Sequence, residues 1–141
     1  MFYGEFEYKL DEKGRLLVPP AFRRELKDGV VLTSGAEKCI TAYPAAGWKK
    51  LADSLTGGTL SASKMRTLKR SLFASAFPMA MDGQSRITLP APLREYAGIG
   101  DEVVVAGVNE CFELWNKEQW AAEKATSQQQ AWQIIESLER Q

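Results

Sequence analysis

The sequence predicts an α+β protein with a mainly β core, built from two tandem repeats that pack about a pseudo-twofold axis. Residues 2–48 and 73–120 nearly repeat each other, first at an offset of 71 residues (82 minus 11) and then, after one inserted residue, at 72 (103 minus 31). Short apolar stretches alternate with turn residues in both copies, which is typical of strands. Two copies are too few for a solenoid, which needs about three or more. The copies must therefore pack on each other.

Residues of the same type recur at equivalent positions of the two copies. The segment from Asp11 to Pro19 resembles the segment from Asp82 to Pro90, and both contain Asp-x-x-x-Arg. The other matching pairs are Phe2/Phe73, Phe6/Phe77, Arg23/Arg94, Val31/Val103, Gly35/Gly107, Cys39/Cys111 and Trp48/Trp120. A surface that one copy presents to a partner is therefore presented twice.

The first copy has a clear order of elements. A two-residue period predicts a strand over residues 2–10, whose buried face consists of Phe2, Phe6, Tyr8 and Leu10. A turn at 11–14 leads into a strand over 15–18, and we expect these two strands to pair as a hairpin. After two prolines the pattern predicts a short helix over 21–26, strands over 30–33 and 39–43, and a helix over 45–55.

The second copy is expected to repeat this order. Its pattern predicts strands over 77–81, 86–89, 102–106 and 111–115, a short helix over 91–97 ended by Gly98, and a helix that begins near Lys117. Between the copies, Ser61 is the expected N-cap of a helix over 61–72. We divide the single domain of residues 1–141 into a first repeat (1–55), a linker helix region (56–72), a second repeat (73–124) and a C-terminal helix (125–141). Ala131, Ile135 and Leu138 form a short apolar seam in that last helix.

Composition limits the classes of function. The 141 residues include 18 basic and 18 acidic side chains, and the zero net charge counts against indiscriminate nucleic-acid binding but not against a locally basic face. The chain has no histidine, which removes histidine-based acid–base catalysis, nucleophile pairs and metal sites. No Walker loop or GxGxxG motif is present. We expect no enzyme activity, no cofactor, no metal site and no small-molecule substrate.

The sequence also indicates where the protein works. No apolar run approaches the about 20 residues that a membrane helix needs, and the first residues lack the basic and apolar regions of a signal peptide. Cys39 and Cys111 do not make a disulfide framework and are expected to be buried small hydrophobic residues. These observations predict a cytoplasmic protein that does not bind membranes.

The Asp-x-x-x-Arg motif at the tip of each predicted hairpin is the main candidate for function. The four-residue spacing lets the aspartate accept hydrogen bonds from the N–H groups of the turn or from the arginine, and so brace a projecting loop. Arg15 and Arg86 are suited to bidentate contact with phosphate or guanine. The alternative interpretation is a solvated hairpin with a local ion pair, which contributes little to stability.

Other charged residues lie close to these motifs in the sequence. Lys9 and Lys13 cluster on the first hairpin only, so the two halves are not expected to contribute equally. Arg23 and Arg94 open the short helices behind the hairpins. They either face the same side as the turns or pair with Glu25 and Glu95.

Together these motifs resemble the MraZ family of bacterial regulators, over nearly the whole chain. The resemblance is carried by the opening Met-Phe-x-Gly, Asp-x-x-Gly-Arg at 11–15, Asp-x-x-x-Arg at 82–86, Leu93-Arg-Glu-Tyr-Ala-Gly98 and Phe112-Glu-Leu-Trp115. It implies an AbrB-like swapped-hairpin β-barrel in which the two halves interleave, with flanking helices. It also implies a ring-shaped homo-oligomer.

The resemblance further implies a sequence-specific DNA-binding transcriptional regulator, cytoplasmic and associated with the nucleoid. The family binds double-stranded DNA at repeated short boxes upstream of its own operon of division and cell-wall genes, typically as a repressor. Its DNA contacts are made through the Asp-x-x-x-Arg loops. The DNA-binding residues expected here are Arg15, Arg86, Lys13 and Lys9, and the residues expected to shape the loops are Asp11, Gly14, Asp82 and Gly83.

The second loop departs from the family pattern, because Ser85 stands where the family usually has glycine. If that position needs a positive φ, serine would strain or reshape the turn.

A function of a different class stays open on the sequence. It is a non-catalytic protein-binding oligomeric scaffold, or the antitoxin-like partner role that some AbrB-type folds have. Zero net charge favours this alternative, whereas the paired arginine hairpins favour DNA binding.

Overall fold

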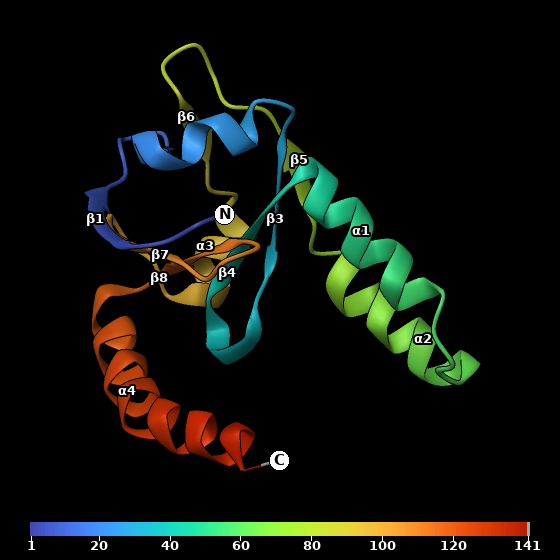
Figure 1. Ribbon diagram of the computed structural model, residues 1–141. Helices are drawn as coiled ribbons and strands as arrows, with labels where there is room; N and C mark the ends of the chain where they lie inside the picture. Colours follow the sequence, from blue (N-terminus) through green and yellow to red (C-terminus); the bar gives the residue numbers. More distant parts are fainter. Residues whose placement is uncertain (141) are drawn as a thin grey trace.

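Eight strands form two antiparallel sheets in the computed structural model, which describes residues 1–140 (Figure 1). The six-stranded sheet has the order β1 (Glu5–Lys9), β7 (Glu102–Gly107), β8 (Phe112–Trp115), β4 (Ile40–Pro44), β3 (Val30–Ser34) and β5 (Phe77–Met79). The second sheet, called the β2–β6 ribbon below, consists of β2 (Arg15–Leu17) and β6 (Arg86–Thr88). The predicted α+β class with a mainly β core is confirmed.

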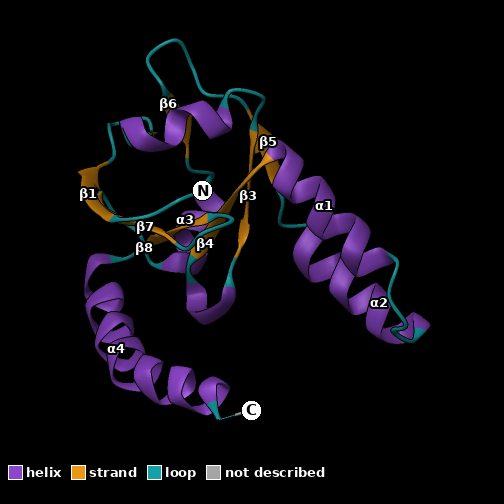
Figure 2. Cartoon of the chain, viewed as in Figure 1, coloured by secondary structure: helices purple, strands orange, loops and turns teal. Residues whose placement is uncertain are grey.

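Helices flank both sheets (Figure 2). In chain order they are the 3-10 helices η1 (Pro20–Leu26) and η2 (Ala36–Lys38), the α-helices α1 (Ala45–Thr56) and α2 (Ala62–Leu68), the π-helical turn η3 (Lys69–Phe73), and the α-helices α3 (Ala91–Ala97) and α4 (Lys117–Glu139). Trp48 of α1 packs edge-on against Phe73 of η3, with ring centroids 5.6 Å apart. The helices α1 and α2 therefore extend from the sheet together, while α4 leaves from another side (Figure 1).

The two copies exchange strands. β1 pairs with β7 and β5 pairs with β3, so the first strand of each copy joins the sheet of the other. β2 pairs with β6. The prediction that β1 and β2 pair as a local hairpin was therefore wrong, as was the same prediction for β5 and β6. Alternating hydrophobicity shows which face of a strand is buried, but it does not show which strand is the partner.

A pseudo-twofold axis relates the copies, and two residue pairs lie on it. In the ribbon Leu16 pairs with Ile87, its equivalent in the other copy, and in the large sheet Thr41 pairs with its equivalent Glu113. A residue can lie opposite its own equivalent only where the axis passes. The strand orders β1-β7-β8 and β5-β3-β4 are then symmetrical about it.

The pairing register corrects the repeat alignment in one strand. Phe6 pairs with Val105, and its equivalent Phe77 pairs with Leu32. Leu32 is thus equivalent to Val105, which lies 73 residues later (105 minus 32), and the alignment of Val31 with Val103 was one residue out. Both strands are continuous apolar runs, and such a run does not show which residues face the core.

The main core lies between the six-stranded sheet and a second layer made by the β2–β6 ribbon, η1 and α3. Leu16 and Ile87 of the ribbon are 0% and 1% exposed and belong to one cluster with Val105 and Phe112 of the sheet. Within residues 1–140 the sheet remains open, since β1 and β5 each pair on one side only. The expected closed barrel is therefore not formed, because β2 and β6 pair with each other across the core rather than with these edges.

Several local predictions are confirmed. The Ser61 side chain caps α2 by accepting a hydrogen bond from the Lys64 N–H, and Gly98 ends α3 with a φ of 66°. Cys39 and Cys111 are buried and unpaired within the described chain, and burial raises the pKa of each thiol to about 12.

The C-terminal part of the chain is one long helix. α4 runs without a break through the division expected at 124/125, and Gln141 lies outside the described residues. Across residues 1–140, no helix combines the length and the apolar character that crossing a membrane requires.

Candidate nucleic-acid interface

The first Asp-x-x-x-Arg motif forms a turn that its own aspartate closes. One carboxylate oxygen of Asp11, Oδ1, accepts hydrogen bonds from the N–H groups of Lys13 and Arg15, both at 2.9 Å. The other oxygen, Oδ2, accepts from Arg15 Nε at 2.5 Å. These bonds, above all the one from the Arg15 N–H, hold the pKa of Asp11 below its usual value. The carboxylate thus shapes the turn and orients the guanidinium.

The second motif has the same hydrogen bonds. Asp82 Oδ1 accepts from the N–H groups of Gln84 and Arg86, both at 2.9 Å, and Oδ2 accepts from Arg86 Nε at 2.9 Å. The pKa of Asp82 is also lowered, chiefly by the Arg86 N–H.

The residue just before the motif arginine has a left-handed backbone conformation in both copies. Gly14 has a φ of 75° and Ser85 has a φ of 60°. Each donates its N–H to the carbonyl of the motif aspartate at 3.0 Å. The position therefore needs a positive φ, as the glycine in the first copy suggested. The second turn keeps its shape at the expense of strain at Ser85.

The β2–β6 ribbon brings the two turns together. Each turn accepts a hydrogen bond from the other copy: the Val18 N–H donates to the Ser85 carbonyl and the Leu89 N–H donates to the Gly14 carbonyl, both at 2.9 Å. Arg86 Nη1 lies 3.7 Å from Asp11 Oδ2. Asp11 therefore sits between the guanidiniums of Arg15 and Arg86, and the two motifs form one continuous cluster.

The outer face of the ribbon carries four side chains. Leu16 and Ile87 point into the core, so their neighbours point away from it. In this face Arg15 lies opposite Thr88, and Leu17 lies opposite Arg86. The arginine side chains are 29% and 23% exposed. Leu17 and Thr88 were not among the residues predicted for this surface, although their alternation with buried neighbours was a signal that could have placed them here.

Arg23 and Arg94 brace the turns from behind. Arg23 Nε donates to the Val18 carbonyl at 3.0 Å, and Arg94 Nε donates to the Leu89 carbonyl at 3.1 Å. A Cβ atom added to Gly14 would lie 3.3 Å from Arg94 Cζ, so this guanidinium lies directly against the first turn. Within residues 1–140 neither arginine forms an ion pair with the neighbouring glutamates of its helix.

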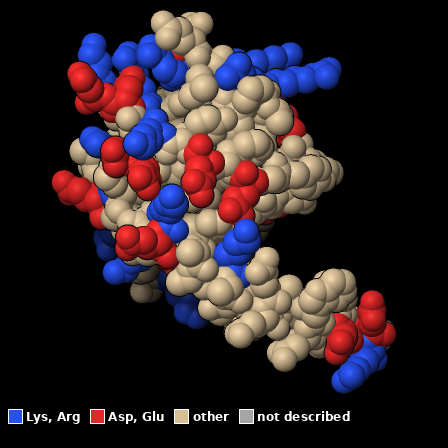
Figure 3. All heavy atoms as spheres, turned by 90° about the vertical axis from the view of Figure 1, so that its left-hand side faces the viewer, with Lys and Arg blue, Asp and Glu red and all other residues tan. Residues whose placement is uncertain are grey.

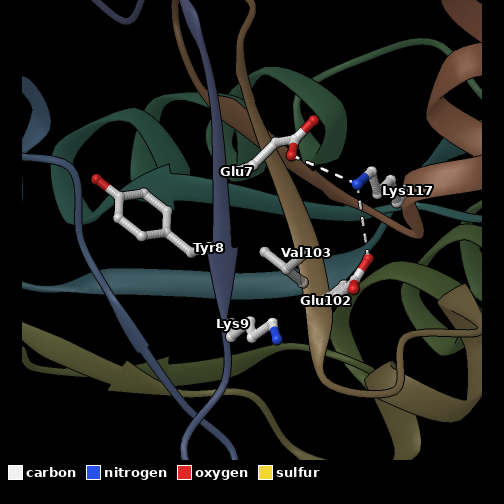
Figure 4. A pocket seen from close by; sticks show the side chains of 6 residues that line it. All are labelled: Glu7, Tyr8, Lys9, Glu102, Val103 and Lys117. Atoms are coloured by element: carbon white, nitrogen blue, oxygen red, sulfur yellow. Dashed lines mark ion pairs between the residues drawn. The ribbon is translucent and has the colours of Figure 1, made fainter.

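The two lysines that were assigned to the first predicted hairpin lie on different surfaces. Lys13 is exposed at the tip of the first turn, beside Arg15. Lys9 alternates with Tyr8, which faces the main core, and therefore points off the opposite face of the sheet. Figure 4 shows Lys9 there with Glu7, Glu102 and Lys117, around a hollow of about 240 Å³. The structure thus does not bring Lys9 to the arginine cluster.

Surface charge is distributed unevenly, although the chain is neutral overall. Figure 3 shows Lys and Arg gathered at the upper end of the molecule, which in Figure 1 carries η1 and the turn before β6. Across the middle of this face Asp and Glu are interspersed with further Lys and Arg, and the surface of α4 is largely uncharged up to its end. Within the described part of the chain, no three His, Cys, Asp or Glu side chains gather into a group that could hold a metal ion.

Comparison with known proteins identifies the family. A family profile described as "MraZ protein, putative antitoxin-like" matches the chain twice, at residues 1–71 and 72–139. The chain belongs to the MraZ family. The family resemblance drawn from the sequence is thereby confirmed, and the profile matches each half of the chain once.

Individual relatives match this MraZ-family chain over most of their length, and they share one name. A protein of Dehalococcoides mccartyi named "Transcriptional regulator MraZ" is 62% identical over 140 residues, covering 99% of both chains. Proteins of the same name from Deinococcus radiodurans and Thermus thermophilus are each 40% identical, over 128 residues (91% of this chain and 90% of the relative) and 122 residues (85% of both).

Proposed function

We propose that this chain is a transcriptional regulator that binds double-stranded DNA sequence-specifically through the outer face of the β2–β6 ribbon. The observation that supports it most is the convergence of Arg15 and Arg86 on one exposed face, across the pseudo-twofold axis. A two-stranded ribbon fits the major groove of B-DNA, and arginine pairs with guanine in a bidentate manner. The names of the relatives agree with a regulatory role.

The residues of the turns have distinct roles in this proposal. The Nε atom of each arginine donates to its aspartate, and Arg86 Nη1 also lies 3.7 Å from Asp11 Oδ2. The remaining N–H groups of each guanidinium can point at bases or phosphates. Asp11 and Asp82 hold the guanidiniums in place and do not touch DNA, because a carboxylate is repelled by phosphate. Lys13 adds a phosphate contact beside the first turn. Gly14 shapes the first loop through its positive φ. In the second loop Ser85 has that conformation, and Gly83, whose φ is not positive, contributes only as a residue without a side chain.

Lys9 acts in this proposal at longer range, because it lies off the ribbon. Its charge adds to the field of the first half, but it makes no base contact from the opposite face of the sheet.

We further propose that the fold is an AbrB-like swapped-hairpin arrangement and that subunits assemble into a ring. The exchange of β1 and β5 between the copies supports the first point. The end of α4 supports the second, because its large apolar side chains Trp132, Ile134, Ile135 and Leu138 are 39% to 70% exposed and suit contacts with another subunit. A neutral subunit with two small loops gains affinity for DNA when several subunits bind neighbouring boxes together.

On this proposal the target is the set of repeated boxes in the promoter of its own division and cell-wall operon. The protein represses that operon from the cytoplasm, in association with the nucleoid.

A gel shift with the DNA upstream of its own gene tests the proposal. The wild-type protein should retard this fragment more strongly than a shuffled fragment of the same length. The Arg15→Ala/Arg86→Ala double variant should lose the preference. The matched control is Arg66→Ala, which removes a positive charge from exposed α2, away from the ribbon. Equal retardation of both fragments by wild type would refute the proposal.

The second candidate function is an antitoxin-like or scaffolding partner role. The family description names the antitoxin-like role, and the zero net charge permits either one. It predicts no preference for the upstream fragment and a stable complex with a second protein, which co-purification from its native cell would reveal.

A further inference from the structure

An exposed leucine lies in the middle of the arginine-bearing surface. Leu17 is 39% exposed, although it belongs to a strand whose next residue towards the turn, Leu16, is fully buried. It lies opposite Arg86 in the ribbon and two residues from Arg15 on the same face. A single exposed leucine on an ordinary surface needs no explanation. Here, however, it is flanked by the two side chains that the proposed function directs at DNA.

We propose that Leu17 recognises the 5-methyl group of a thymine in the major groove, and that it is a specificity-determining residue of the ribbon. This inference rests on the proposed function. Thymine is the base that presents a methyl group in the major groove, and apolar side chains contact that group. Charged neighbours on both sides would fix the ribbon in the groove, so that Leu17 has no freedom to turn away from the bases.

The geometry predicts where that thymine lies. Residues two apart in a strand are separated by about 6.6 Å, and successive base pairs are about 3.4 Å apart. Arg15 and Leu17 therefore span about two base-pair steps along the groove. The thymine contacted by Leu17 should lie within about two base pairs of a guanine contacted by Arg15.

The equivalent position of the second copy carries a different side chain. Thr88, which lies opposite Arg15, offers a methyl group and a hydroxyl where Leu17 offers only apolar surface. The pseudo-twofold ribbon thus presents unlike groups to the two halves of one box. Each box should accordingly lack twofold symmetry in its bases, in spite of the symmetry of the backbone.

Replacement of thymine by deoxyuridine, which removes only the 5-methyl group, tests this inference. A duplex from upstream of the gene is prepared with one thymine at a time replaced, and binding is followed by fluorescence anisotropy at fixed salt. For wild type, we expect one replacement within a box to weaken binding about fourfold, the effect of one buried methyl group. Replacement of a thymine that Leu17 does not contact should have no effect on binding.

The same scan with Leu17→Ala supplies the decisive comparison. This variant should bind the unmodified duplex less tightly and should show no further loss with deoxyuridine at the sensitive position. Leu17→Ile should retain the sensitivity. The matched control is Leu60→Ala, which truncates a leucine that is 46% exposed between α1 and α2, and it should behave like wild type throughout.

The possible outcomes separate this inference from the proposed function. If wild type binds the duplex specifically but no thymine is sensitive, or if Leu17→Ala keeps the full deoxyuridine effect, the role of Leu17 is refuted and the proposed function stands. If wild type does not bind the duplex specifically, both are refuted. Circular dichroism of Leu17→Ala should match wild type, because an exposed side chain on a surface strand contributes little to the core.

Discussion

Ser85→Gly should stabilise the protein, and the reciprocal change Gly14→Ser should destabilise it. Both residues occupy the same position in equivalent turns, with φ values of 60° and 75°. Both make the same hydrogen bond to their motif aspartate. The pair therefore compares serine and glycine at one left-handed position within a single chain.

The size of the effect follows from two opposing terms. A left-handed conformation costs a non-glycine residue about 1–2 kcal/mol. Ser85→Gly removes this cost, but glycine loses more conformational freedom on folding than serine does, which offsets about 0.5–1 kcal/mol of the stability gained. Ser85→Gly should therefore raise the free energy of unfolding by about 0.5–1 kcal/mol. For a chain of this size, that corresponds to an increase in Tm of about 2–3 °C.

Gly14→Ser should have the larger effect. It incurs the same left-handed cost, and its Cβ would lie 3.3 Å from Arg94 Cζ, so this guanidinium must shift and its bond to the Leu89 carbonyl must adjust. We expect a loss of about 1–2 kcal/mol, or a Tm lower by about 3–6 °C.

Thermal unfolding followed by circular dichroism measures both shifts. All samples need the same protein concentration, because the proposed assembly of subunits would make Tm depend on concentration. A lower Tm for Ser85→Gly, or an unchanged Tm for Gly14→Ser, would show that backbone strain does not distinguish the two turns. The Ser85→Gly protein should bind DNA like wild type, since the hydrogen bonds of its turn are unchanged.

Three further predictions concern DNA binding and one concerns the pH dependence of the turns. Arg15→Ala should weaken operator binding more than Arg86→Ala, because Lys13 adds positive charge to the first turn. A lost bidentate base contact costs about 1–3 kcal/mol per site. Equal losses of affinity for the two variants, titrated at the same salt concentration, would contradict this. Asp11→Ala should also weaken binding without changing the circular dichroism spectrum, since Asp11 orients both guanidiniums, and a gain in affinity would overturn that role. The pKa values of Asp11 and Asp82 are lowered in the folded turns. The stability that these carboxylates give to the turns should therefore be complete at neutral pH and be lost as the pH falls through the lowered pKa values, below the usual 3.8. A pH titration in which that stability is instead lost near neutral pH would contradict this. Inserting about 5 bp between boxes should damage binding more than inserting a full turn of about 10–10.5 bp, as gel shifts can show, because the half-turn places the boxes on opposite faces of the duplex.

The sequence by itself determined the elements and their buried faces. The two-residue period around Phe6 and Tyr8 indicated a strand with one apolar face, and both side chains pack against the main core. Ser61 and Gly98 marked the ends of helices correctly. These features depend on interactions between residues close together in the chain, and such interactions leave a local pattern. The duplication showed in addition that a pseudo-twofold arrangement was needed.

Only the tertiary structure decided which strands pair and which charges meet. The exchange of β1 and β5, the ribbon that places Leu16 opposite Ile87, and the approach of Arg86 to Asp11 all join residues that are at least 45 apart in the chain (77 minus 32). Lys9 was grouped with Lys13 on the first predicted hairpin because the two are close in sequence. Its side chain points instead off the face of the sheet opposite to that of Tyr8. Backbone hydrogen bonds between strands are the same for almost any side chain. Which strands pair therefore depends on how both copies together bury their apolar faces, and no local sequence pattern indicates that arrangement.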